Sequence, residues 1–127
     1  MIKGIEHTAI ASPDPQGLAQ WYIERLGFVK NFQTPDGKAL FLKAPDGWLI
    51  EVLESNGPAA DASQMKDPGI RHMALTVADF DAAYASLQAA GVAFLTPKAT
   101  IGGNTTAFFR DCEGNILHLL HREKPLP

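Results

Sequence analysis

The sequence has few of the features that mark secreted or membrane proteins. It contains a single cysteine, Cys112, so an internal disulfide is excluded. It has no stretch of the roughly 18 apolar residues needed for a membrane span. Its first residues also lack the apolar region of a secretory signal. These absences predict a soluble, cytoplasmic protein without a membrane partner.

The chain also lacks a strong excess of charge of either sign. Eleven Lys and Arg residues against fourteen Asp and Glu residues give a formal charge of -3, and the charges do not form blocks. This pattern argues against a nucleic-acid partner. With 127 residues, 46% of them hydrophobic, the chain suits one globular domain and is too short for two independent ones.

An internal repeat is the main feature that is present. Residues 4–10 (GIEHTAI) align with residues 69–75 (GIRHMAL), 65 positions later. Two further pairs of segments follow in the same order and at similar offsets, 26–29 with 90–93 and 41–53 with 108–120. Three blocks that keep their order, with the small drift expected of loop insertions, indicate a duplicated unit.

Each half is predicted to contain a strand, a helix and three further strands. Asp14 is expected to cap a helix that starts at Pro15 and ends at Gly27, and Asp79 and Gly91 are expected to bound its counterpart. In the first half the strands are expected at 5–11, 28–34, 38–44 and 48–54. In the second half a strand containing His72 precedes the helix, and strands are expected after it at about 92–96, 105–111 and 115–121.

Four ionisable residues occupy equivalent positions of the two halves. His7 and His72 lie in the first strands, and Glu51 and His118 lie in the last. Because side chains alternate along a strand, each shares its face with apolar neighbours, where an unpaired carboxylate is costly. A bound metal would satisfy all four at once. His and carboxylate ligands without thiolate suit Zn²⁺, Ni²⁺, Co²⁺, Mn²⁺ or Fe²⁺ better than Ca²⁺ or Mg²⁺.

Taken singly, these residues have simpler explanations. An isolated His in an apolar strand is more often a hydrogen-bonded core or rim residue, and an isolated Glu is more often exposed. The matching of all four positions favours the metal. His121 falls on the strand face opposite His118 and is predicted to be a surface residue, and Cys112 is predicted to be a turn thiol without a chemical role.

The chain resembles the vicinal oxygen chelate superfamily, also called the glyoxalase/bleomycin resistance/dioxygenase family. The segments that carry the resemblance span almost the whole chain: 5–10, 22–28, 46–52, 70–75 and 111–119. It implies an α+β fold of two tandem βαβββ modules, whose curled mixed sheets form a cleft that binds one divalent transition metal. It gives one domain over 1–127, with module 1 at about 1–55, a linker at 56–68 and module 2 at about 69–123. The resemblance also implies a small substrate with neighbouring oxygens and a homodimeric assembly. The cleft could form within one chain or between two.

By matching position, the resemblance carries His7, Glu51 and His72 over as metal ligands. His118 departs from the pattern, because metal-dependent members commonly have Glu there, and it is either a fourth ligand or a displaced general base. Bacterial glyoxalase I-like chains tend to bind glutathione through an Arg and an Asn where this chain has Ala11 and Ser55. Specific glutathione binding is therefore not expected.

The leading hypothesis is a metal-dependent, glyoxalase-like lyase or isomerase that removes a proton next to a carbonyl, with Glu51 and His118 as catalytic candidates. One alternative is a non-haem Fe(II) extradiol-type dioxygenase, since two His and one carboxylate match its iron ligands. Another is a non-catalytic drug-binding or resistance protein. The substrate depends on loops 33–38, 55–69 and 98–105, whose sequences do not identify it.

Overall fold

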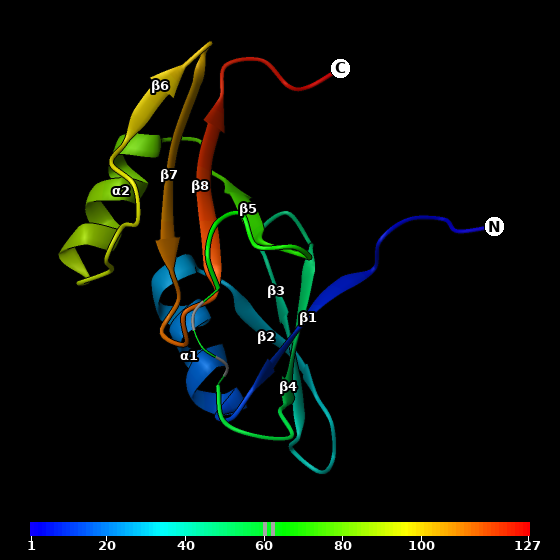
Figure 1. Cartoon of the computed structure of the whole chain (residues 1–127). Helices are drawn as coiled ribbons and strands as arrows, with labels where there is room; N and C mark the ends of the chain where they lie inside the picture. Colours follow the sequence, from blue (N-terminus) through cyan, green and yellow to red (C-terminus); the bar gives the residue numbers. More distant parts are fainter. Residues whose placement is uncertain (60, 62) are drawn as a thin grey trace. The chain divides into compact units, whose positions relative to one another are not determined.

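The computed structural model describes residues 1–59, 61 and 63–127, and it divides the chain into two compact units, Met1–Ala60 and Asp61–Pro127. Two residues of the predicted linker 56–68, Ala60 and Ala62, lie outside the described residues. Each unit holds one helix and one four-stranded mixed sheet (Figure 1). The predicted α+β fold of paired βαβββ modules is therefore confirmed.

The first unit contains β1 (His7–Ser12), α1 (Pro15–Leu26), β2 (Val29–Gln33), β3 (Ala39–Lys43) and β4 (Leu49–Glu54). The sheet order is β1-β4-β3-β2, with β1 parallel to β4 and the other pairs antiparallel. The predicted helix is confirmed at both ends. The Asp14 side chain accepts a hydrogen bond from the backbone N–H of Gly17 at the start, and Gly27 ends the helix in the left-handed conformation that glycine adopts most readily.

The second unit contains β5 (His72–Thr76), α2 (Phe80–Ala89), β6 (Ala99–Ile101), β7 (Asn104–Arg110) and β8 (Ile116–Arg122). Its sheet order, β5-β8-β7-β6, repeats the connectivity of the first sheet. Asp79 caps α2 as predicted, by accepting a hydrogen bond from the backbone N–H of Ala82. In the part of the chain that the structure describes, no helix has the length and apolarity to cross a membrane.

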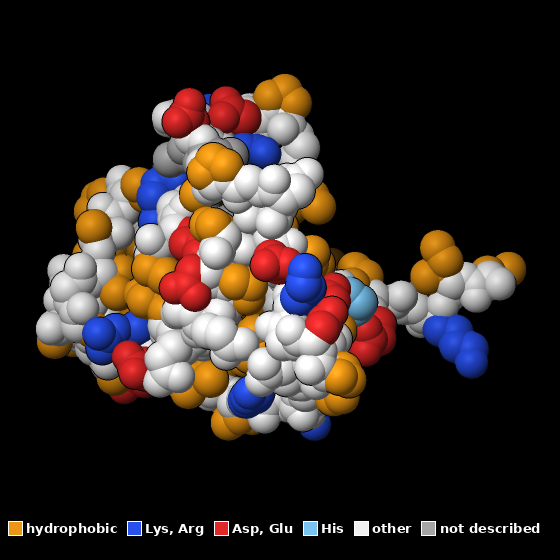
Figure 2. All heavy atoms as spheres, turned by 90° about the horizontal axis from the view of Figure 1, so that it is seen from below, with side chains coloured by type: hydrophobic (Ala, Val, Ile, Leu, Met, Phe, Trp, Pro, Cys, Tyr) orange, Lys and Arg blue, Asp and Glu red, His pale blue; other side chains and the backbone are white. Residues whose placement is uncertain are grey.

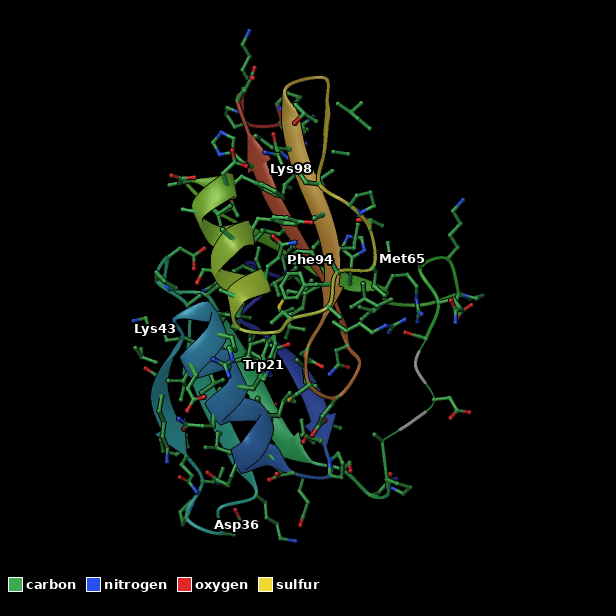
Figure 3. All side chains as sticks on the ribbon, turned by 90° about the vertical axis from the view of Figure 1, so that its left-hand side faces the viewer. Trp21, Asp36, Lys43, Met65, Phe94 and Lys98 are labelled. Atoms are coloured by element: carbon green, nitrogen blue, oxygen red, sulfur yellow. The ribbon has the colours of Figure 1, made fainter. Side chains whose placement is uncertain are left out.

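Two strand predictions need correction. Residues 92–96, all of them described, form no strand, and only Phe94 makes an isolated bridge, with Phe109. Packing is the reason, because Phe94 contacts both Tyr84 of α2 and Phe109 of β7 and so anchors the segment by its side chain (Figure 3). The edge strand β6 forms instead at Ala99–Ile101, within the predicted loop 98–105. The first strand begins at His7 instead of residue 5, and Ile5 is exposed.

In each unit the helix covers one face of the sheet, and the face without a helix is called the open face. Helix α1 packs against all four strands of its sheet, and α2 packs against β8. The buried residues of β4 are Ile50 and Val52, so the residue between them, Glu51, lies on the face away from the helix. Leu117 and Leu119 are buried in β8, which places His118 in the same way. The core thus directs the candidate site residues onto the open face.

Candidate metal-binding site

The last strand of each module follows the same tight turn, which fixes where its site residue lies. In the first module the Asp46 carboxylate accepts the backbone N–H of Trp48, and Gly47 adopts a left-handed conformation. In the second module the buried Asp111 carboxylate accepts the N–H groups of Glu113 and Asn115, and Gly114 takes the role of Gly47. The backbone of the turn thus repeats, because Gly47 N–H donates to the carbonyl of Ala44 and Gly114 N–H donates to the carbonyl of Asp111. The side-chain acceptors Asp46 and Asp111 occupy different positions of the two turns.

The first module brings His7 and Glu51 together. His7 lies on β1 and Glu51 on the adjacent parallel strand β4, where Glu51 is opposite Ala9. Their facing atoms, His7 Nε2 and Glu51 Oε2, are 3.3 Å apart. The ring of His7 also meets Phe41 of β3 edge-on, with centroids 5.5 Å apart. The Glu51 side chain is 24% exposed, so a ligand on the open face can reach it.

The second module brings His72 and His118 together in the equivalent arrangement. His118 is opposite Ala74 on β5, as Glu51 is opposite Ala9. The ring centroids of His72 and His118 are 5.3 Å apart. Phe108 of β7 takes the place of Phe41, because His72 meets it edge-on at 5.2 Å. The His118 ring stacks on Phe108 at 4.1 Å with an interplanar angle of 9°. The two predicted pairs therefore form on corresponding strands with corresponding aromatic neighbours.

Within each module, the described residues include no group of three or more His, Cys, Asp or Glu side chains that could hold a metal. One module alone thus offers a pair of candidate ligands. Binding of one metal by His7, Glu51, His72 and His118 together remains a prediction.

The environments of two imidazoles differ in their effect on protonation. The hydrogen bond that His7 donates to the adjacent Glu6 carboxylate raises the pKa of His7, and the nearby charge of Glu51 acts in the same direction. Burial lowers the pKa of His118, and the neighbouring His72 and Arg122 lower it further. Both effects favour the neutral form of the His118 ring.

Three further residues, not predicted from the sequence, contact the candidate ligands. The Glu6 carboxylate forms a hydrogen bond with Nδ1 of His7, and the Thr106 hydroxyl forms one with Nε2 of His118. Phe108 stacks on His118. Phe108 could have been found, because the repeat pairs it with Phe41. Glu6 and Thr106 had no such signal, since their repeat counterparts are Arg71 and Ala39.

Two other predicted assignments meet different outcomes. His121 is half-buried, and its Nδ1 lies 3.0 Å from the carbonyl oxygen of Val77, so it is part of the structure of the second module and not a simple surface residue. Cys112 is exposed in the turn before β8, as expected. Ala11 and Ser55 stand where bacterial glyoxalase I-like chains tend to have an Arg and an Asn. Ala11 is exposed, and the Ser55 hydroxyl donates a hydrogen bond to the carbonyl of Gly57 at 2.5 Å.

Comparisons with known proteins agree with this architecture. The chain is 31% identical over 122 residues to the uncharacterized protein YurT of Bacillus subtilis. The alignment covers 91% of this chain and 96% of YurT. The glyoxalase family protein from Enterococcus faecalis matches with 28% identity and a TM-score of 0.72, over 94% of this chain and 98% of that one.

Solved structures with the same fold differ widely in function. The lactoylglutathione lyase from Agrobacterium tumefaciens matches with a TM-score of 0.71 and 16% identity, over 94% of both chains. TnmS3, an antibiotic-binding protein from Streptomyces sp. CB03234, matches with a TM-score of 0.74 and 24% identity, over 96% of this chain and 95% of that one. At these identities the likeness shows the fold alone.

The family model of the Glyoxalase/Bleomycin resistance protein/Dioxygenase superfamily matches residues 4–119, a span that includes both modules and all four candidate ligands. The chain belongs to this superfamily.

Proposed function

We propose that this protein is a metal-dependent, glyoxalase-like lyase or isomerase that acts on a small substrate with two neighbouring oxygens. The observation that supports this most is the 3.3 Å separation of His7 Nε2 and Glu51 Oε2 on the open face of the first sheet. Two donors that bind one ion at about 2.0–2.2 Å, at tetrahedral or octahedral angles, lie about 2.8–3.6 Å apart. The pair thus fits adjacent positions of one transition-metal shell.

His7, Glu51 and His72 would hold the ion, which when bound would polarise a substrate carbonyl and stabilise the negative charge that develops on its oxygen. In a five- or six-coordinate shell, three protein ligands leave positions open for the two substrate oxygens. Their composition, two imidazoles and one carboxylate, suits Zn²⁺, Ni²⁺, Co²⁺, Mn²⁺ or Fe²⁺.

His118 is proposed as the general base instead of a fourth ligand. Its Nε2 is already bonded to the Thr106 hydroxyl, and Phe108 fixes the plane of its ring. When Nε2–H donates to Thr106, Nδ1 carries the lone pair that accepts a proton. The lowered pKa of His118 keeps the ring in this neutral form.

The experiment has two steps. Purified protein is stripped of metal, reloaded with each of the five ions and analysed for metal content, and about one ion per four-residue set is expected. Each form is then incubated in deuterium oxide with a panel of small α-hydroxycarbonyl compounds, and proton NMR follows exchange at the carbon next to the carbonyl. Exchange that needs the ion but not oxygen supports the proposal. Metal uptake at adventitious levels only would refute it, and oxygen consumption with catechols and Fe²⁺ would favour a dioxygenase.

A second candidate is a non-catalytic binder of flat apolar molecules. Phe32 of β2, 53% exposed, lies 6.1 Å from Phe41 between ring centroids, and Phe41 in turn contacts His7. An exposed aromatic ring beside a half-buried one offers apolar contact area to a planar molecule. Tight binding of a planar compound that is unaffected by metal removal, in a protein without turnover, would favour this function.

A further inference from the structure

Glu6 contacts the ring nitrogen of His7 that does not face Glu51. It lies immediately before β1, its side chain is 71% exposed, and its carboxylate contacts Nδ1 of His7. The other ring nitrogen, Nε2, faces Glu51 Oε2 at 3.3 Å. His7 therefore stands between two carboxylates, one at each ring nitrogen.

This arrangement constrains where the proton of a neutral His7 can be. A carboxylate only accepts hydrogen bonds, and a neutral imidazole has one N–H, so His7 can donate to Glu6 or to Glu51 but not to both. Nδ1 makes a hydrogen bond with Glu6, whereas Nε2 lies 3.3 Å from Glu51, so the proton is assigned to Nδ1. With the proton on Nδ1, Nε2 carries a lone pair that faces the oxygen of Glu51. Two acceptors at this distance repel each other unless a second proton or another cation lies between them, and a neutral His7 with Nδ1–H thus leaves a place for a cation bound by both Nε2 and Oε2.

We infer that Glu6 is a positioning residue that holds His7 in the Nδ1–H tautomer and so reserves Nε2 for a metal shared with Glu51. A carboxylate that holds the outer nitrogen of a metal-binding His both fixes the tautomer and makes the ligand more basic. Glu6 itself contacts His7 on the side away from Glu51, which agrees with a role outside the metal shell. This inference rests on the proposed function for the identity of the cation, but not for the tautomer.

The second module provides an internal control. The repeat counterpart of Glu6 is Arg71, whose side chain donates to the carbonyl oxygens of Gly69 and Gln64. An arginine cannot accept a hydrogen bond from an imidazole. The tautomer of His72 should accordingly be independent of Glu6.

The test uses the metal-free protein, labelled with nitrogen-15, at a pH at which the imidazoles are neutral. Long-range proton–nitrogen NMR correlations distinguish Nδ1–H from Nε2–H for each ring. We expect His7 to be Nδ1–H in the wild type and to shift toward Nε2–H in Glu6→Ala, because Nε2–H can then donate to Glu51. Glu6→Gln should retain the wild-type tautomer in large part, since its amide oxygen still accepts. His72 should not change in any variant.

Metal affinity gives the second readout. Competition with a chromogenic chelator should show Zn²⁺ binding weakened about 10- to 100-fold in Glu6→Ala and much less in Glu6→Gln. Glu24→Ala, which removes an exposed carboxylate from α1, controls for the loss of charge and should bind as the wild type does.

An unchanged His7 tautomer in Glu6→Ala would overturn the inference, and so would equal losses of affinity in Glu6→Ala and Glu24→Ala. A tautomer shift in a protein that binds no metal would refute the proposed function while leaving the positioning role of Glu6 intact. The two failures are thus distinguishable.

Discussion

Replacing His118 with alanine separates the roles of base and ligand most directly. Within the second module the His118 side chain stacks on Phe108, hydrogen-bonds the Thr106 hydroxyl and meets the His72 ring edge-on. If His118 is the base, His118→Ala should leave metal affinity close to that of the wild type. The rate of proton exchange should fall by about 10²- to 10⁴-fold, as is usual for a lost general acid–base group.

The same contacts set the expected loss of stability. An aromatic pair contributes about 0.5–1.5 kcal/mol beyond buried area, and a hydrogen bond of this kind contributes about 0.5–1.5 kcal/mol net. His118→Ala should therefore lower the free energy of unfolding by about 1–3 kcal/mol. Many small domains tolerate such a loss, so the variant should fold, and thermal unfolding followed by circular dichroism checks this.

Glu51→Gln is the matched comparison. It keeps the size of the side chain but removes the only carboxylate of the proposed shell, so metal affinity should fall together with activity. Both variants are titrated with Zn²⁺ against a chromogenic chelator and assayed for deuterium exchange at saturating metal. A tenfold or larger loss of affinity in His118→Ala would place this residue in the metal shell. Wild-type affinity in both variants would mean that neither residue binds the ion.

Three further outcomes are expected. Because the ion would bind the folded state alone, a free concentration one hundred times the dissociation constant should raise the free energy of unfolding by about 2.7 kcal/mol, and an unchanged melting temperature would contradict binding. Glutathione hemithioacetal should be a poor substrate, because each charge-assisted contact missing at Ala11 and Ser55 costs about 1.5–3 kcal/mol, or roughly 10- to 150-fold in binding; efficient lactoylglutathione formation at micromolar substrate would show otherwise. In the metal-free protein, NMR titration should find the pKa of His7 above the ordinary histidine value and that of His118 below it. The stability that His7 contributes is then present below its unfolded pKa and is lost as pH rises through its folded pKa. His118 has the opposite effect, because it destabilises the fold as pH falls through the ordinary pKa of histidine. Reversed pKa shifts would contradict the contacts described.

The sequence alone determined the duplicated architecture. The signals that carry it, which are strand alternation, helix caps and glycine turns, are local properties, and each half of the sequence contains them independently. Asp14 and Gly27 bound α1 for reasons contained in the four or five residues around them. The repeat also identified which residues correspond, and the structure places His7 with Glu51 and His72 with His118 on matching strands. The path of residues 92–101 was not predictable in this way, since the packing of Phe94 against Tyr84 and Phe109 decides it.

Only the tertiary structure decided the surroundings of the candidate ligands. Thr106 is twelve residues from His118 in the sequence and reaches it because β7 and β8 pair in one register. Glu6 is next to His7, yet its role depends on Glu51, which β4 brings to the other side of the ring. Sequence periodicity assigns a residue to a face of a strand, whereas side-chain partners across neighbouring strands depend on register and rotamer, which no local pattern specifies.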